Sequence, residues 1–223
     1  MAKFNGPKIV TDGLVLCLDA GNSKSYPGSG TVWTDLSGRN NNGTLTNGPT
    51  FDASNAGSIV FDGVNDYVSL ASLDLSGTQM SVCCSIKPIT LGSGSNVNVI
   101  LRKGEGNPNN YQFMLGDSKI CFILNQDDFN GRISSTTLQT GKWYHAAVSY
   151  NAGSVAVYLN GDVDGTSSIA STIGNDSRNT YIGSRNGGDF TSNQISNIVV
   201  YNRALSAEEI RQNFNATRYR FGI

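Results

Sequence analysis

The stretch at residues 141–165, GKWYHAAVSYNAGSVAVYLNGDVDG, constrains the fold more than any other part of the chain. Aromatic and β-branched residues fill two short runs, at residues 143–150 and 155–159, and a third run begins at Val163. Asn160-Gly161 separates the last two runs, and this pair favours a type I′ turn because both central positions of that turn need φ above zero. The stretch therefore predicts three antiparallel strands.

The first of these strands is predicted to lie inside a sheet that is covered on both sides. Successive side chains of a strand point to opposite faces. Both alternating sets of side chains at residues 143–150 are largely apolar. A strand of this kind avoids water only if each face packs against another part of the protein.

Three motifs resemble the laminin-G-like domains of the concanavalin A-like lectin/glucanase superfamily. They are W-x-H-x-A-x-x-Y followed by Y-x-N-G at residues 143–161, WTDLSG followed by NGT at residues 33–44, and IVVYNRALSAEEI at residues 198–210. The resemblance implies an all-β, concanavalin A-like jelly-roll β-sandwich with one short C-terminal helix. It places the sandwich at residues 13–214, an N-terminal arm at residues 1–12 and a C-terminal tail at residues 215–223.

The remaining strands are expected to be short and regularly spaced, as in a sandwich or barrel. The runs that favour strands lie at residues 14–19, 58–61, 67–70, 80–86, 96–102, 111–115, 119–124, 180–182 and 194–201. Residues 58–61 and 67–70 are expected to pair as a hairpin, and residues 20–57 to be mainly loop. A helix is expected after Ser206, because Ser206 and Glu209 are spaced as a capping box.

Composition excludes several classes of protein. The 223 residues suit one all-β domain, and a charged fraction of 15% with a net charge of −1 argues against a nucleic-acid-binding surface. We expect no membrane span and no signal peptide, because the chain has no apolar run of about 20 residues and its first residues lack an apolar core. The four cysteines lie in apolar runs without zinc spacing, so we expect them to be reduced and buried.

Enzymatic chemistry is not expected from this sequence. Glycoside hydrolysis needs two carboxylates that face one groove. The glucanases of the superfamily carry Glu-x-Asp-x-Glu on one strand, and this chain has no such pattern among its three glutamates, Glu105, Glu208 and Glu209. The single histidine, His145, falls in the middle of the central hairpin and is interpreted as a buried structural residue.

A structural calcium site is one interpretation of the loop at residues 35–44. Asp35, Asn40 and Thr44 bring side-chain oxygens together, and calcium takes six to eight oxygen ligands. The resemblance implies that some relatives hold calcium here with an acidic residue of the closing strand, where this chain has Ser196-Asn197. The alternative is a loop of Asx turns that binds no metal. No other cofactor is expected.

Three loops combine aromatic side chains with amide, carboxylate or guanidinium groups. Aromatic faces stack on the apolar faces of sugars, while amides and carboxylates bind hydroxyl groups. The alternative is ordinary solvated loops. The residues that we expect to contact a ligand are Tyr111, Asp127, Asp128, Phe129, Arg185, Asp189 and Phe190.

The two ends of the chain are the expected partner-binding segments. The tail alternates apolar and basic residues like a strand, so it is expected either to join the domain's own sheet or to dock on a partner by strand addition. Tyr, Phe and Arg are also enriched at interface hot spots. The residues expected at the partner surface are Phe4, Arg218, Tyr219, Arg220 and Phe221.

The resemblance also implies a biological setting. Small chains of this type, with reduced cysteines and no signal peptide, are similar to structural proteins of tailed-phage virions. We expect a non-enzymatic surface-display module, a head decoration or tail adhesion protein that binds a capsid or tail protein, a host surface glycan, or sister copies. The alternative is a free, cytoplasmic carbohydrate-binding lectin. No nucleic-acid or membrane partner is expected, and the fold alone does not decide between these functions.

Overall fold

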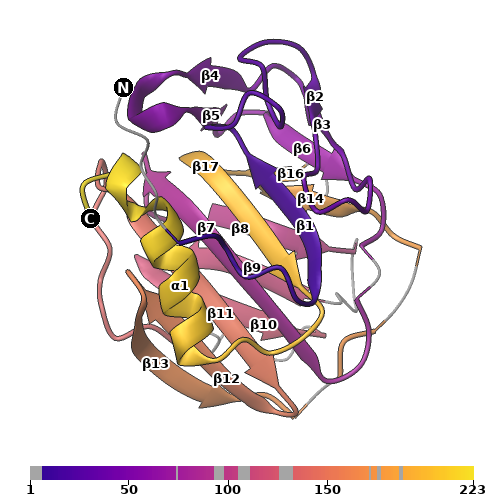
Figure 1. Ribbon diagram of the computed structural model, residues 1–223, viewed down its shortest axis with the longest axis vertical. Coiled ribbons are helices and arrows are strands. Elements are labelled where there is room, and N and C mark those ends of the chain that lie inside the picture. Colours follow the sequence, from indigo (N-terminus) through magenta and orange to yellow (C-terminus); the bar gives the residue numbers. More distant parts are fainter. Residues whose placement is uncertain are drawn as a thin grey trace.

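Two large antiparallel sheets face each other in the computed structural model, which describes residues 7–73, 75–92, 98–104, 111–125, 133–170, 172–174, 177–185 and 188–223. Figure 1 shows the two layers one behind the other, with a single α-helix lying across the front sheet. The prediction of an all-β sandwich with one short C-terminal helix is confirmed. In the described part of the chain, no helix is long and apolar enough to cross a bilayer.

We call the front sheet, which carries the helix, sheet A. Its strands follow the order β13-β12-β11-β7-β17-β5-β4, and β1 also pairs with β17. Their bounds are β1 Leu14–Asp19, β4 Thr50–Asp52, β5 Ser58–Asp62, β7 Gln79–Pro88, β11 Tyr144–Asn151, β12 Ser154–Leu159, β13 Asp162–Ser168 and β17 Ser192–Tyr201.

The rear sheet is sheet B, with the strand order β10-β9-β8-β14-β6-β3-β2. Its strands are β2 Val32–Trp33, β3 Gly43–Thr46, β6 Tyr67–Leu70, β8 Asn98–Lys103, β9 Tyr111–Gly116, β10 Lys119–Leu124 and β14 Thr180–Ile182. A small separate hairpin consists of β15 Ser184–Arg185 and β16 Gly188–Phe190.

The central hairpin forms as predicted. Strands β11, β12 and β13 are antiparallel neighbours, and Asn160 and Gly161 in the turn have φ values of 52° and 86°. The inward side chains of β11, such as Val148 and Tyr150, join the main core, while its outward side chains lie under the helix. Both faces of β11 are therefore buried, as its two apolar faces require.

The helix α1, Ala207–Thr217, begins with the predicted capping box. The Ser206 hydroxyl accepts a hydrogen bond from the Glu209 N–H, and the Glu209 carboxylate accepts one from the Ser206 N–H. Leu205 and Ile210 are buried on the outer face of sheet A, in one cluster with Cys83 and other residues of that face. The four cysteines are buried and reduced, as predicted.

The expected hairpin of residues 58–61 and 67–70 is wrong, because β5 belongs to sheet A and β6 to sheet B. Both strands carry inward apolar side chains, Phe61 on β5 and Val68 on β6, and both enter the same core from opposite sheets. The connection crosses the edge of the sandwich, where the Asp62 carboxylate accepts the N–H groups of Val64 and Asn65. Residues 20–57 also contain β2, β3, β4 and the 3₁₀ turn η1, Ser54–Ala56.

The C-terminal tail is not a strand of either sheet, so the expectation that it joins the domain's own sheet is wrong, while docking on a partner stays a prediction. Helix α1 is followed directly by the 3₁₀ turn η2, Arg218–Arg220. The Arg220 guanidinium donates two hydrogen bonds to the Asp19 carboxylate, at 2.6 and 2.9 Å, and the Phe221 ring lies 4.5 Å from the Trp143 ring. Gly21 permits this approach, because a Cβ there would lie 2.7 Å from Arg220 Nη1.

The other residues expected at a partner surface are placed as follows. The Arg218 guanidinium lies 5.4 Å from the centre of the Phe214 ring, Tyr219 is 43% exposed, and Phe4 lies outside the described residues. The end of the N-terminal arm packs on α1, where the Val10 N–H donates to Asn213 Oδ1 at 2.9 Å. The described parts of both ends are therefore built into the domain.

Candidate functional site

The outer face of sheet B carries a row of side chains that can bind polar ligands. Backbone pairing aligns Thr44 of β3, Ser69 of β6, Tyr181 of β14, Arg102 of β8 and Gln112 of β9 across five strands. Their neighbours along each strand, such as Val68 and Leu101, point into the core. Because strand side chains alternate between faces, this row points away from the core.

An aromatic cluster lies beside this row. The Tyr67 ring is 6.0 Å from the Tyr181 ring in an edge-to-face arrangement and 6.3 Å from the Phe190 ring in a stacked one. All three residues are partly exposed. Aromatic rings with an exposed face offer flat apolar area together with, in tyrosine, a hydroxyl that can form hydrogen bonds.

The hairpin of β15 and β16 brings one predicted ligand loop to this cluster. Phe190 contacts Tyr67, and Arg185 forms an ion pair with Asp189 at 3.2 Å. The Arg185 and Asp189 side chains are 27% and 52% exposed, so both charged groups can be reached from solvent. The structure thus brings the hairpin of Arg185, Asp189 and Phe190 to Tyr67 and Tyr181, two tyrosines that are not among the predicted ligand residues.

The outer face of sheet B becomes more buried and more apolar toward β9 and β10. Arg102 and Gln112 are 3% and 4% exposed, and beyond them a buried apolar cluster covers the outer side of β8, β9 and β10. This cluster consists of Val99, Met114, Cys121 and Ile123. The reachable part of the face is therefore the region around β6, β14 and the β15–β16 hairpin.

The other predicted ligand residues are placed differently. Tyr111 is fully buried, with its hydroxyl 3.5 Å from Thr180 Oγ1, because it occupies an inward position on β9. A ligand on the surface therefore does not reach Tyr111 in this structure. Asp127, Asp128 and Phe129 lie outside the described residues.

The loop that was interpreted as a calcium site is organised around the Asp35 carboxylate. Oδ1 accepts the N–H groups of Cys17 and Ser37, each at 2.9 Å, and Oδ2 accepts the Ser37 hydroxyl at 2.7 Å and the Asn41 N–H at 3.0 Å. Asn40 and Thr44 are exposed, and Asn40 has a φ of 60°. A cation at Asp35 would have to compete with these four donors. The described residues contain no cluster of three or more acidic, cysteine or histidine side chains suited to a metal.

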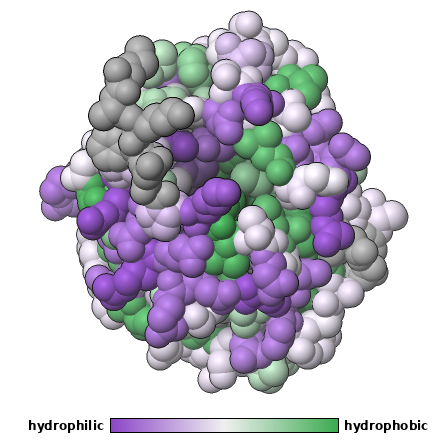
Figure 2. Space-filling model, in the orientation of Figure 1, coloured by the Kyte–Doolittle hydropathy of each residue, from purple (hydrophilic) through white to green (hydrophobic). Residues whose placement is uncertain are grey.

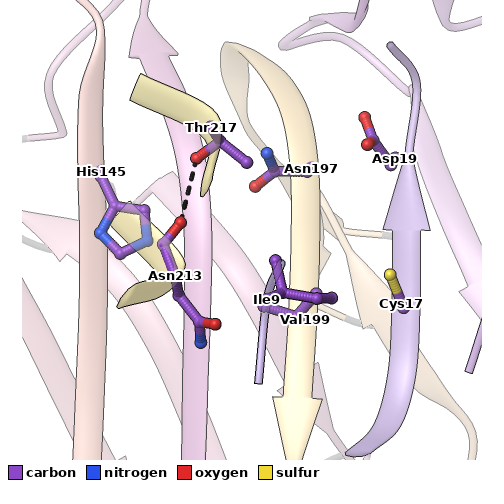
Figure 3. A pocket seen from close by; sticks show the side chains of 8 residues that line it. All are labelled: Ile9, Cys17, Asp19, His145, Asn197, Val199, Asn213 and Thr217. Atoms are coloured by element: carbon purple, nitrogen blue, oxygen red, sulfur yellow. Dashed lines mark hydrogen bonds between the residues drawn. The ribbon is translucent and has the colours of Figure 1, made fainter. Parts of the chain in front are cut away.

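A small crevice lies on the opposite side of the sandwich, between α1 and sheet A. Figure 2 shows apolar surface gathered around a hollow in the middle of this face, with polar side chains around it. The crevice has a volume of about 30 Å³ and is lined by residues of the arm, sheet A and α1 (Figure 3). These residues are Ile9, Cys17, Asp19, His145, Asn197, Val199, Asn213 and Thr217.

His145 is the titratable group at the inner end of this crevice. It is 2% exposed, and its burial lowers its pKa from 6.5 to about 4. Backbone pairing aligns four polar residues on neighbouring strands of sheet A, in the order His145, Ser85, Asn197 and Asp19. We call this row the polar line. The Asp19 carboxylate is thus three strands away from the His145 imidazole and does not stabilise a protonated ring. This distance agrees with the interpretation of His145 as a neutral, buried residue.

The family follows from the sequence itself. Residues 62–211 match the family model of the laminin-G type that is described as the concanavalin A-like lectin/glucanases superfamily. The chain belongs to this superfamily. The matched segment covers the outer-face residues Tyr67, Tyr181 and Phe190 as well as the central hairpin. A search of curated protein sequences gave no match.

Solved structures share the fold at low sequence identity. Domain 4 of the arabinanase AbnA from Geobacillus stearothermophilus, solved in complex with arabinotriose, has a TM-score of 0.73 and 17% identity, covering 91% of this chain and 98% of that one. A Trypanosoma rangeli sialidase with the inhibitor DANA has a TM-score of 0.67 and 16% identity, covering 96% of this chain and 36% of that one. The binding domain of Paraclostridial Mosquitocidal Protein 1 has a TM-score of 0.68 and 17% identity, covering 92% and 52%.

These similarities correct the expectation that the chain is not an enzyme. That expectation was drawn from the lack of a Glu-x-Asp-x-Glu strand, yet structures that share the fold include a domain of a glycoside hydrolase of family GH43 and a sialidase. The missing motif therefore does not separate this chain from proteins with glycosidase activity. The chain spans about a third of the sialidase and about half of the toxin binding domain.

Proposed function

We propose that this protein binds a carbohydrate on the outer face of sheet B, around Tyr67, Tyr181 and Phe190. The observation that carries the proposal is the aromatic cluster, with ring centres 6.0 and 6.3 Å apart, next to a row of polar side chains. Sugars combine apolar ring faces with many hydroxyl groups, and a site of this composition matches both.

Each part of the site has a distinct role in this proposal. The exposed faces of the three aromatic rings stack against the sugar ring. Arg185 and Asp189 stand at the edge, where a guanidinium donates to hydroxyl oxygens and a carboxylate accepts from hydroxyl groups. Thr44 and Ser69 continue the polar surface across β3 and β6. On the other outer face, α1 covers the centre of sheet A (Figure 1).

The comparisons support the carbohydrate class without naming the sugar. The domain of AbnA was solved with arabinotriose, and a Trypanosoma rangeli sialidase was solved with sialic acid. These two sugars are chemically different, a neutral pentose oligomer and a carboxylated nonose. Both therefore belong in the first set of probes.

We further propose that the binding module is displayed on the virion of a tailed phage, on the head or the tail, where it contacts a host surface glycan. This setting is supported by the sequence motifs at residues 33–44, 143–161 and 198–210. Immunogold labelling of purified particles with an antibody against the protein tests it. Particles that carry no label, together with free protein that binds glycans, would favour the alternative of a free lectin.

Carbohydrate binding is tested on a glycan array, followed by calorimetric titration with arabinotriose, sialic acid and the best array ligand. Tyr181→Ala should weaken binding about fivefold, because one stacked ring contributes about 1 kcal/mol. Tyr219→Ala is the matched control, since Tyr219 is an exposed tyrosine on η2, which follows α1 on the sheet A side. The proposal fails if no carbohydrate binds or if both variants bind as the unaltered protein does.

A further inference from the structure

Three buried polar atoms beneath the end of α1 have no hydrogen-bond partner among the described residues. They are His145 Nδ1, Ser85 Oγ and Asn197 Nδ2. Their residues are 2%, 0% and 6% exposed, and they lie next to one another on β11, β7 and β17. Paired residues on neighbouring strands share a face, so all three side chains point from sheet A toward the helix.

Other buried polar groups between α1 and sheet A do have hydrogen-bond partners. The Ser81 hydroxyl donates to Arg203 O at 3.0 Å and accepts from the Leu205 N–H at 2.9 Å, and the Ser149 hydroxyl donates to Leu205 O at 2.9 Å. Asn213 accepts from the Val10 N–H and donates to the Tyr201 hydroxyl. Buried polar groups are nearly always paired with protein atoms or with water, so the three atoms need a partner.

The orientation of Asn197 is fixed by a backbone contact. Ser85 N–H donates to Asn197 Oδ1 at 3.1 Å, so the carbonyl oxygen of the amide is already used. The NH₂ group of the same amide consequently points elsewhere. Figure 3 shows the Asn197 amide and the His145 ring approaching the space beside Thr217 from two different strands.

The crevice has the size and chemistry for water. Its volume of about 30 Å³ exceeds the 10–15 Å³ that a single water needs, and a buried water usually has about three polar partners. His145 Nδ1 accepts a hydrogen bond in the neutral tautomer that carries its proton on Nε2, Asn197 Nδ2 donates one, and the Ser85 hydroxyl does either. The other lining residues are the apolar Ile9, Cys17 and Val199 and the polar Asp19, Asn213 and Thr217, and the small volume excludes larger polar ligands.

We propose that this crevice is a binding site for ordered water, held by His145 and Asn197, which line it, and by Ser85 on the strand between them. This water joins the polar side chains of sheet A to the last turn of α1. Thr217 contributes the helix side of the site, because it lines the same crevice. Asp19, at the opposite end of the line, is already paired with Arg220 of the tail. In this proposal, the water and the Asp19–Arg220 ion pair hold the C-terminal end of α1 at two separate points.

A high-resolution crystal structure of the unaltered protein is the first test. We expect a solvent peak within about 2.7–3.2 Å of His145 Nδ1 and Asn197 Nδ2. In solution, the nuclear Overhauser effect between water and the Ser85 and Asn197 amides should report a long-lived water. His145→Phe removes the acceptor and fills the space with an apolar ring, so both the peak and the water signal should disappear.

Ser149→Ala is the matched control, because it removes a buried hydroxyl of the same face whose partner is a backbone carbonyl. This variant should keep the peak and the signal. The crystal structure of the unaltered protein tests the proposal even if His145→Phe does not fold. Two results would overturn it: no solvent peak in the crevice, or direct hydrogen bonds in which protein atoms donate to His145 Nδ1 and accept from Asn197 Nδ2.

Discussion

Acidification between pH 6.5 and pH 4 should destabilise this protein through His145. The imidazole is 2% exposed, and burial lowers its pKa in the folded chain to about 4, while an unfolded chain protonates histidine near pH 6.5. Within this interval the unfolded state holds one more proton than the folded state. The free energy of unfolding therefore rises with pH across the interval and falls as the solution is acidified.

The magnitude follows from the two pKa values. Stability changes by about 1.4 kcal/mol for each pH unit in which one state is protonated and the other is not. From pH 6.5 to about 4 this amounts to about 3 kcal/mol, a sizeable part of the 5–15 kcal/mol typical of a folded domain. Below pH 4 the imidazole is protonated in both states, so its contribution to the pH dependence ends.

Urea unfolding followed by tryptophan fluorescence, at several pH values from 7.5 to 4, measures this effect. His145→Gln is the reference, because it removes the titrating group and keeps every carboxylate. Hydrogen bonds to Asp62 and Glu209 lower the pKa of these carboxyl groups, so the stability that they contribute is lost only as the pH falls through their lowered folded-state pKa values. This loss is the same in the unaltered protein and in the variant. The stability advantage of the unaltered protein over the variant should shrink by about 3 kcal/mol on acidification. Parallel pH profiles for the two proteins would refute the reasoning.

Three further predictions follow from individual contacts. Removing residues 218–223, or replacing Arg220 by Ala, should lower the melting temperature, because Asp19 loses a charged hydrogen-bonding partner worth about 2 kcal/mol; unchanged melting of the truncated protein would contradict this. Chelation by EDTA should leave the melting temperature unchanged, since four donors already occupy the Asp35 carboxylate; a calcium-dependent rise that Asp35→Asn abolishes would show a bound cation. Ser206→Ala should reduce the free energy of unfolding by about 1 kcal/mol through loss of the capping box. A chemical denaturation curve that matches that of the unaltered protein would contradict this prediction.

Local sequence signals predicted the local structure well. Asn160-Gly161 sets its turn through backbone conformations that few residue pairs adopt, and Ser206 with Glu209 sets the helix start through hydrogen bonds within one turn. The strands at Leu14–Asp19, Tyr67–Leu70 and Lys119–Leu124 have the bounds expected from their apolar runs. These features depend on residues that are close together in the chain.

Two features that depend on distant parts of the chain were not predicted. The tail looked like a strand because apolar and basic residues alternate, whereas Asp19 and Trp143 decide its conformation through an ion pair and a ring contact. Tyr67 and Tyr181 were missed because only the pairing of β6 with β14 brings them together. Their one signal in the sequence is an exposed aromatic position that alternates with apolar positions on a short strand.

The most direct test of the central claim locates the carbohydrate on the protein. Amide chemical shifts of isotope-labelled protein are recorded during titration with the best ligand from the glycan array, and with arabinotriose and sialic acid. We predict that the largest changes map to β6, β14 and the β15–β16 hairpin, around Tyr67, Tyr181 and Phe190. Saturable changes that map instead to α1, to the crevice beneath it or to the loop around Asp35 would contradict the account.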